Sequence, residues 1–226
     1  MGVESMSGIY TAEKVCLDVV AEVSAMVTHE VNNSLAVINE NAGYLDDLVL
    51  MVGEDGELPA ERVKRSVTSI ASQVRRTNNL MKKLNRFAHS GDEPVAAIDL
   101  VESLQVMITL TGRKADSSEI SVGLESVDPV IITTKPQMVY TLIYLCLRHL
   151  YQEAGAGSVV KCEVYRSEDE EEVAVLRFQV TAQQGANFSK LPEDRSLALI
   201  IAEVSAKVQT ENDGILVKLP HSSSMA

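Results

Sequence analysis

The hydrophobic positions of the first fifty residues recur at helical spacing. Between residues 11 and 51 there is no proline and one glycine, Gly43, and apolar side chains follow one another in steps of three and four. That spacing places them on one face of an α-helix, so we predict a helix of about forty residues. The stripe consists of Val20, Val23, Val27, Val31, Leu35, Ile38, Ala42, Leu45 and Val49.

A second apolar stripe begins after a short polar break. The run Gly53–Glu57 ends the first pattern, and Pro59 suits the first position of a new helix that ends near Ser90. The apolar positions alternate in steps of four and three, which is a heptad pattern. Two long helices joined by a short loop lie antiparallel, so we predict a helical hairpin over residues 1–92. This stripe consists of Val63, Val67, Ile70, Val74, Thr77, Met81, Leu84 and Ala88.

The two arms of the hairpin carry opposite charge. Residues 1–57 contain eleven acidic residues and one lysine, whereas residues 59–90 contain eight basic residues and one acidic residue. Opposite charge favours pairing of the arms, although each exposed ion pair contributes only about 0–1 kcal/mol. Two helices cannot bury both stripes, so we expect a homodimer whose hairpins form a four-helix bundle. The alternative is that the C-terminal region covers the stripe within one chain.

The remainder of the chain, residues 93–226, predicts a separate α/β domain after a linker at Gly91–Pro94. Helical patterns cover residues 98–112, 135–153 and 194–207. Strand patterns cover residues 120–124, 129–132, 158–166 and 173–181, and a closing hairpin turns at Asn212–Gly214. The predicted fold class is therefore α+β, a long antiparallel helical hairpin followed by an α/β sandwich.

Composition excludes several classes of protein. The chain has 226 residues, of which 46 % are hydrophobic and 4 % aromatic, and its net charge is −12. An acidic surface with few stacking platforms disfavours a nucleic-acid partner. No apolar run is long enough to span a membrane, and Met1–Tyr10 lacks the features of a signal peptide. Cys16, Cys146 and Cys162 are too far apart for a disulfide framework or a metal motif, so we expect the reducing cytoplasm.

His29 is the histidine with the most informative surroundings. His29 lies two residues after Val27 and two residues before Val31. At 100° per residue, its side chain is about 200° around the helix from the apolar stripe. Glu30 beside it is a group that can hold the proton of one ring nitrogen, and Asn33 lies one helical turn further. An ordinary solvated surface histidine is the alternative. A zinc protease motif is excluded, because Asn33 occupies the position of the second histidine ligand, and no metal site is expected.

The segment His29–Leu35 resembles the H-box of bacterial sensor histidine kinases, in which the pattern HExxN precedes an apolar residue. The long hairpin and the α/β domain after it match that family too. The resemblance implies a dimeric four-helix bundle in which His29 is the phospho-acceptor. It further implies that Glu30 acts as the base of the histidine and that Asn33 orients water when a partner is dephosphorylated.

The α/β domain departs from the family where ATP binds. The family holds Mg²⁺ through two asparagines four residues apart, but no asparagine occurs between residues 86 and 186, and Tyr144 and Arg148 stand at those positions. The adenine-binding motif is replaced at residues 180–186, which lack its aspartate, and the glycines of the phosphate loop are replaced at Ser196–Leu199. We therefore expect no ATP binding and no cofactor.

This combination resembles the dimeric histidine phosphotransferases that have a degenerate ATPase domain. It implies a two-component phosphorelay in which His29 takes a phosphoryl group from one response-regulator receiver domain and passes it to another. We expect the receiver to dock beside His29 and to contact Arg62, Lys64 and Arg65 of the second helix. Three alternatives remain open, which are a receiver phosphatase that uses Asn33, a kinase with an unusual nucleotide site, and a non-catalytic dimeric docking protein.

Overall fold

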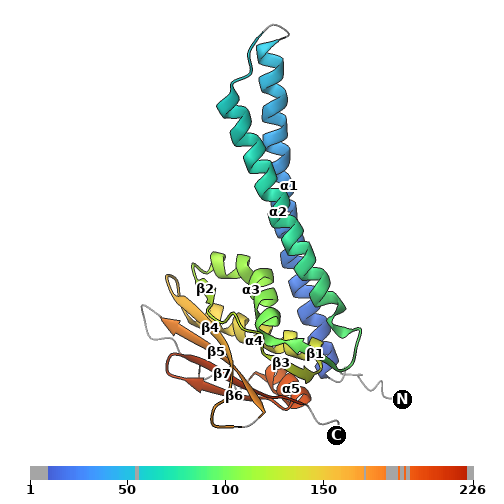
Figure 1. Ribbon diagram of the computed structural model, residues 1–226, viewed down its shortest axis with the longest axis vertical. Helices are drawn as coiled ribbons and strands as arrows, with labels where there is room; N and C mark the ends of the chain where they lie inside the picture. The colour runs from blue at the N-terminus through green and yellow to red at the C-terminus, as the bar shows by residue number, and fades with distance from the viewer. Residues whose placement is uncertain are drawn as a thin grey trace, which may run out of the picture.

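The computed structural model describes residues 10–53, 56–170, 172–181, 188, 191 and 194–222. Its first two helices, α1 (Ala12–Val52) and α2 (Ala60–Ala88), form the predicted antiparallel hairpin (Figure 1). The Thr11 hydroxyl accepts the backbone N–H of Lys14 and caps the start of α1. At the other end, Gly53 has a φ of 68°, a conformation that glycine adopts without strain. Pro59 lies one position before the first residue of α2.

The second region of the chain, which follows α2, contains the other helices and the strands among the described residues. It begins with a short 3-10 turn, η1 (His89–Gly91), at the end of α2. The elements that follow are β1 (Ala96–Asp99), α3 (Leu100–Ser117), β2 (Ser121–Leu124), β3 (Ile131–Thr134), α4 (Pro136–Glu153), β4 (Val159–Arg166), β5 (Val173–Thr181), α5 (Arg195–Val204), β6 (Lys207–Glu211) and β7 (Gly214–Pro220). The predicted α+β class is confirmed, whereas the domain boundary at residues 92 and 93 stays a prediction.

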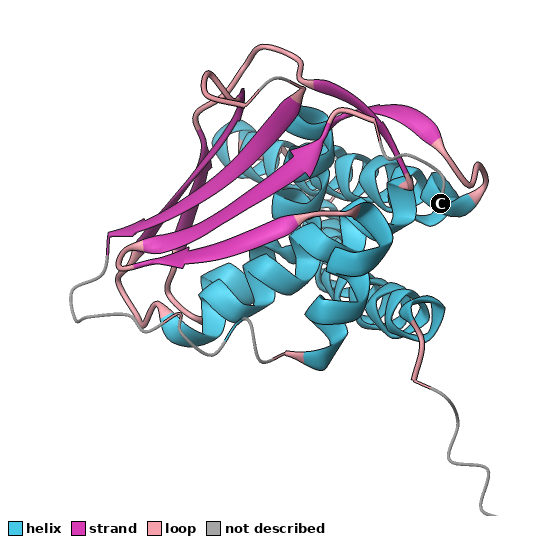
Figure 2. Ribbon diagram, turned by 90° about the horizontal axis from the view of Figure 1, so that it is seen from below, coloured by secondary structure: helices cyan, strands magenta, loops and turns pink. Residues whose placement is uncertain are grey.

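Five strands form one sheet in the order β2-β4-β5-β7-β6. The β2–β4 pair is parallel and the other pairs are antiparallel. Helices α3, α4 and α5 lie against one face of this sheet (Figure 2). Strand β5 is at the centre of the sheet, and its Leu176 and Phe178 are almost fully buried beneath the helices. The central strand thus anchors the layer of helices on which α1 in turn rests.

Several elements differ from the sequence prediction: α3 ends at Ser117 instead of residue 112, and β3 covers Ile131–Thr134 instead of residues 129–132. The segment Ala96–Asp99 is a strand paired with β3, and α3 starts at Leu100 instead of residue 98. Asp99 sets this boundary because its carboxylate accepts hydrogen bonds from two backbone N–H groups. The bond from Val101 caps α3, and the bond from Val130 connects the start of α3 to the segment before β3. Helix α5 ends at Val204, three residues earlier than predicted, because Ser205 adopts the left-handed conformation with a φ of 52°.

The base of the hairpin shares one hydrophobic core with the second region. Val15, Val19, Val23 and Val27 of α1 are almost completely buried and belong to the same cluster as the residues of α3, α4 and α5. Phe87 at the end of α2 joins them. The other half of the hairpin projects away from the second region (Figure 1). The C-terminal region therefore covers the apolar stripe at the base and leaves it open toward the tip.

Candidate functional site

His29 lies in the middle of α1 with an exposed side chain. Val27, two residues earlier, is 2 % exposed and faces the core, so the helix turns His29 toward solvent. The imidazole makes no hydrogen bond or ion pair with any residue that the structure describes. The side chain of His29 is therefore exposed on the side of α1 that the sequence predicts, and its contact with a partner stays a prediction.

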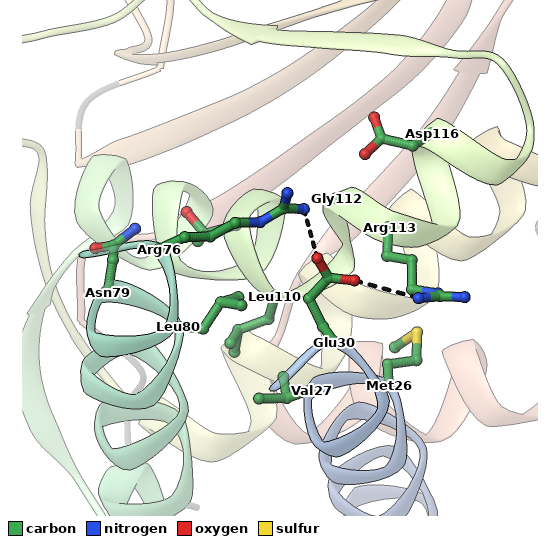
Figure 3. Close-up of a pocket in the computed structure, with 11 residues that line it drawn as sticks. Met26, Val27, Glu30, Arg76, Asn79, Leu80, Leu110, Gly112, Arg113 and Asp116 are labelled. Carbon is green, nitrogen blue, oxygen red and sulfur yellow. Dashed lines mark hydrogen bonds and ion pairs between the residues drawn. The ribbon is translucent and has the colours of Figure 1, made fainter. Parts of the chain in front are cut away.

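Glu30 turns the other way and is held by two arginines. One carboxylate oxygen lies 2.5 Å from Nη2 of Arg76 on α2, and the other lies 3.3 Å from Nη1 of Arg113 on α3. Figure 3 shows the carboxylate between the two guanidinium groups. The sequence predicts that Glu30 orients the imidazole of His29, but in the structure its carboxylate joins α1 to α2 and α3. The reason is the 100° rotation between adjacent helical residues, which separates the two side chains.

A cavity of about 130 Å³ lies beside this ion-pair cluster. Val27, Leu80 and Leu110 form its apolar lining, and Glu30 and the two arginines form its polar side (Figure 3). Apolar surroundings weaken the competition of water for the carboxylate, so the ion pairs are stronger here than on an open surface. The cluster therefore fixes the side of α1 next to His29 against both neighbouring helices.

Replacing Glu30 by glutamine is expected to lower the free energy of unfolding by about 1–2 kcal/mol, because two half-exposed guanidinium groups lose their counter-charge. Urea denaturation followed by circular dichroism measures the difference. The control is Glu40→Gln, which changes an exposed glutamate further along the same helix. If both variants unfold at the urea concentration of the wild type, the two ion pairs of Glu30 contribute nothing to stability.

Asn33 lies one turn beyond His29 on nearly the same side of α1 and is exposed. Its side-chain amide makes no hydrogen bond with another described residue. The amide is thus exposed one turn from His29, and its role at the site stays a prediction.

The three basic residues predicted to bind a partner, Arg62, Lys64 and Arg65, are exposed on the first turns of α2. The structure does not bring them to His29. Because Glu30 contacts Arg76 and the amide of Asn41 donates to Ser69, residue 64 lies level with about residue 44 of α1. At 1.5 Å per residue this is about 20 Å from His29 toward the tip. Their contact with a partner stays a prediction.

Tyr144 and Arg148, which the resemblance places at the positions of two metal-binding asparagines, contact α1 in the structure. The Tyr144 hydroxyl donates a hydrogen bond to the Glu22 carboxylate, and burial is the main cause that raises the pKa of this tyrosine. The Arg148 guanidinium lies 3.9 Å from the same carboxylate and 3.3 Å from that of Asp194. These side chains therefore hold α1 and α5 against α4.

The start of α5 contains Ser196–Leu199, the segment that the resemblance aligns with a phosphate loop. The Asp194 carboxylate accepts the backbone N–H groups of Ser196 and Leu197, so the first amides of this helix already have a partner. Ser196 also shares a hydrogen bond of 2.6 Å with the hydroxyl of Tyr10. Of the altered adenine-binding segment at residues 180–186, residues 182–186 lie outside the described residues.

The described residues contain no group of three or more His, Cys, Asp and Glu side chains arranged to hold a metal ion. Cys16, Cys146 and Cys162 are free and buried, and burial raises the pKa of Cys146 and of Cys162 to about 12. Among the described helices, none has the length and hydrophobicity required to cross a lipid bilayer.

The sequence interpretation missed Glu22, Arg76 and Arg113. Each pairs with a residue of another element, and no local pattern distinguishes them from other exposed charges. The excess of basic residues on the second helix was the single available signal, and it indicated pairing between the arms without naming the partners.

No protein-family model and no curated protein sequence matches the chain. Among solved structures, a bacterial phosphotransferase is 13 % identical over 96 % of this chain and 98 % of its own length, with a TM-score of 0.48. The histidine kinase AdeS of Acinetobacter baumannii is 13 % identical over 85 % of this chain and 98 % of its own, with a TM-score of 0.47. The catalytic domain of the histidine kinase ThkA is 10 % identical over 57 % of this chain and 97 % of its own, with a TM-score of 0.48. At these values the likeness assigns no activity to the chain.

Proposed function

We propose that the chain is a histidine phosphotransferase of a two-component phosphorelay, in which His29 carries the phosphoryl group between receiver domains. The observation that carries this proposal is the exposed imidazole of His29, without a partner among the described residues, on a helix fixed by the core and by the Glu30 ion pairs. A carrier histidine must reach the active sites of other proteins, and rigid support keeps its ring in one position for in-line transfer.

Transfer to the chain requires one nitrogen lone pair. The imidazole nitrogen of His29 attacks the phosphorus of a receiver aspartyl-phosphate, the P–O bond to the aspartate breaks, and a P–N bond forms. The aspartate leaves as a free carboxylate, and the ring proton on the other nitrogen stays or passes to solvent. The second transfer is the reverse of this step on another receiver. The receiver brings its own Mg²⁺, so the chain needs no cofactor of its own.

Two features support a carrier over an ATP-dependent kinase. Tyr144 and Arg148 cannot ligate Mg²⁺ as carbonyl or carboxylate oxygens do, and both contact Glu22 of α1. The Asp194 carboxylate accepts a hydrogen bond from a backbone amide at the start of α5, and its negative charge would repel a phosphate there. We infer that this face of α4 and α5 serves to hold the hairpin.

The proposal is tested by incubating the full chain with receiver domains that carry ³²P-phosphoryl aspartate. We expect label to appear on the chain as an acid-labile, base-stable modification that peptide mapping assigns to His29. A parallel incubation with γ-labelled ATP is expected to give no label. If no receiver transfers label and none loses phosphate faster than it does alone, the phosphotransferase proposal is wrong.

A receiver phosphatase is the second candidate, because the exposed amide of Asn33 is free to orient a water molecule next to His29. The same incubation distinguishes the two. A carrier accumulates labelled histidine and passes it to a second receiver, whereas a phosphatase releases inorganic phosphate from the first receiver. Loss of that release in Asn33→Ala, with transfer to His29 absent, would favour the phosphatase.

We further propose that two copies pair through the projecting half of the hairpin. Leu35 of α1 and Val74 of α2 are 47 % and 43 % exposed. Apolar residues seven positions away on each helix are exposed as well. Residues spaced by seven form one continuous seam along a helix, which a second copy of the acidic and basic arms can cover. The exposed apolar heptads are Leu35, Ala42 and Val49 on α1, and Val67, Val74 and Met81 on α2.

Light scattering after size exclusion is expected to give a dimer mass for the wild type and a monomer mass for Val74→Glu, because a buried charge in the seam is costly. The matched control is Val127→Glu, which places the same charge at a valine that is 85 % exposed outside the hairpin. This control variant should stay dimeric. A monomeric wild type at micromolar concentration would contradict the paired bundle.

A further inference from the structure

A groove runs along the side of α1 that carries His29. Glu22, Ala25 and Met26 form one wall, α3 and α4 form the other, and the volume between them is about 460 Å³. Ala25 lies one helical turn before His29. Glu22 lies seven residues before His29, a rotation about 20° short of two full turns. Ala25 and Glu22 therefore lie on the same side of α1 as His29. The groove therefore ends about one helical turn from His29, which is not one of its lining residues.

Lys114, in the last turn of α3, lines this groove. Its ammonium group makes no hydrogen bond or ion pair with any described residue, whereas Arg148 in the same groove is paired with Asp194 and Glu22. Burial lowers the pKa of Lys114, the Glu22 carboxylate raises it and the Arg148 guanidinium lowers it. Lys114 is thus a half-buried cation whose nearby anion, Glu22, already contacts Tyr144 and Arg148, and a further anion in the groove would stabilise it.

The surroundings of His29 lack another available cation on the same helix. Lys14, close to the start of α1, is the one lysine or arginine of this helix and is paired with Asp18. Arg76 and Arg113 are bound to Glu30. A phosphoryl group on His29 would bring up to two negative charges to an acidic helix, so it needs positive charge from elsewhere.

We propose that Lys114 pairs with the phosphoryl group on His29 and neutralises its charge. The inference rests on the proposed function and extends it by giving the second region a part in carrying the group. The flexible four-carbon stem of a lysine lets the ammonium move from the groove to the ring, one turn further along α1. Lys114 does not form or break the P–N bond. It stabilises the phosphorylated state relative to the free imidazole.

The test loads the full chain with potassium phosphoramidate, which needs no receiver. The P–N bond of the reagent breaks, a P–N bond to the imidazole forms, and ammonia leaves. Phosphorus NMR then follows the phosphoryl resonance against pH, and the resonance missing from His29→Ala identifies the site. A nearby cation favours the dianion, so in Lys114→Ala the midpoint of this titration is expected to rise by about half a unit to one unit. Lys114→Arg should keep the wild-type midpoint.

The matched control is Lys207→Ala, which removes one exposed lysine on β6 and should leave the midpoint unchanged. An equal midpoint in wild type and Lys114→Ala overturns the pairing. Absence of any His29 resonance overturns it too, because the imidazole is then not open to phosphorylation. If the midpoint shifts as expected but no receiver ever labels the chain, the pairing stands and the phosphotransferase proposal fails, so the two failures are distinguishable.

Discussion

Replacing His29 by alanine is expected to reduce phosphoryl transfer from a labelled receiver to background, a loss of about two orders of magnitude or more. Among the described candidate site residues, none besides His29 offers such a nitrogen, since Glu30 is committed to two arginines and Asn33 carries an amide. The substitution lies on an exposed surface, so the free energy of unfolding should change by less than about 0.5 kcal/mol. Label on the chain, quantified after gel separation, measures the effect.

The matched control is His89→Ala. His89 is also exposed, but it caps the end of α2 and pairs with Asp92 at 2.9 Å, at the base of the hairpin. This variant should accept label at the wild-type level. If labelling persists in His29→Ala and disappears in His89→Ala, the carrier is His89 at the base of the hairpin and our proposal for His29 is wrong.

Replacing Phe87 by alanine is expected to lower the free energy of unfolding by about 3–5 kcal/mol. The ring is 1 % exposed and meets Tyr140 of α4 edge to face, with 5.8 Å between ring centroids. Truncation opens a cavity where the end of α2 joins the core of the second region, and it removes an aromatic pair. Guanidinium denaturation followed by circular dichroism measures the loss.

Met81→Ala is the control, because Met81 lies on the same helix and is 40 % exposed. Its variant should lose less than about 1 kcal/mol if measured at a protein concentration where the chain is monomeric. Equal denaturation midpoints for the two variants would mean that the end of α2 is not anchored in the core.

Local patterns were sufficient for the long helices and most strands. The steps of three and four that include Val23 and Val27 predict α1, and the structure confirms it. The four-residue strand β1 was missed because so short a segment carries no distinct period. Its boundary with α3 depends on Asp99, whose carboxylate bonds to Val130, a residue that the chain brings back only after α3 and β2.

The candidate site was predictable in part. The exposure of His29 follows from its angle to Val27 on the helix, and the structure agrees. The partners of Glu30 were not predictable, because Arg76 and Arg113 come from two other elements and meet it only in the folded chain. The sequence motif suggested a role for Glu30 at the imidazole, whereas in the folded chain its carboxylate pairs with these two arginines.

The strand order described above leaves the sheet two open edges, β2 and β6. An edge strand exposes unpaired backbone groups that can recruit a second sheet, and this promotes aggregation. Strand β2 has only four residues, and β6 places Lys207 and Glu211 on its exposed face. Short length and charge both discourage edge-to-edge association. The edges of the sheet are thus protected against self-association, which is consistent with the proposal that copies pair through the hairpin.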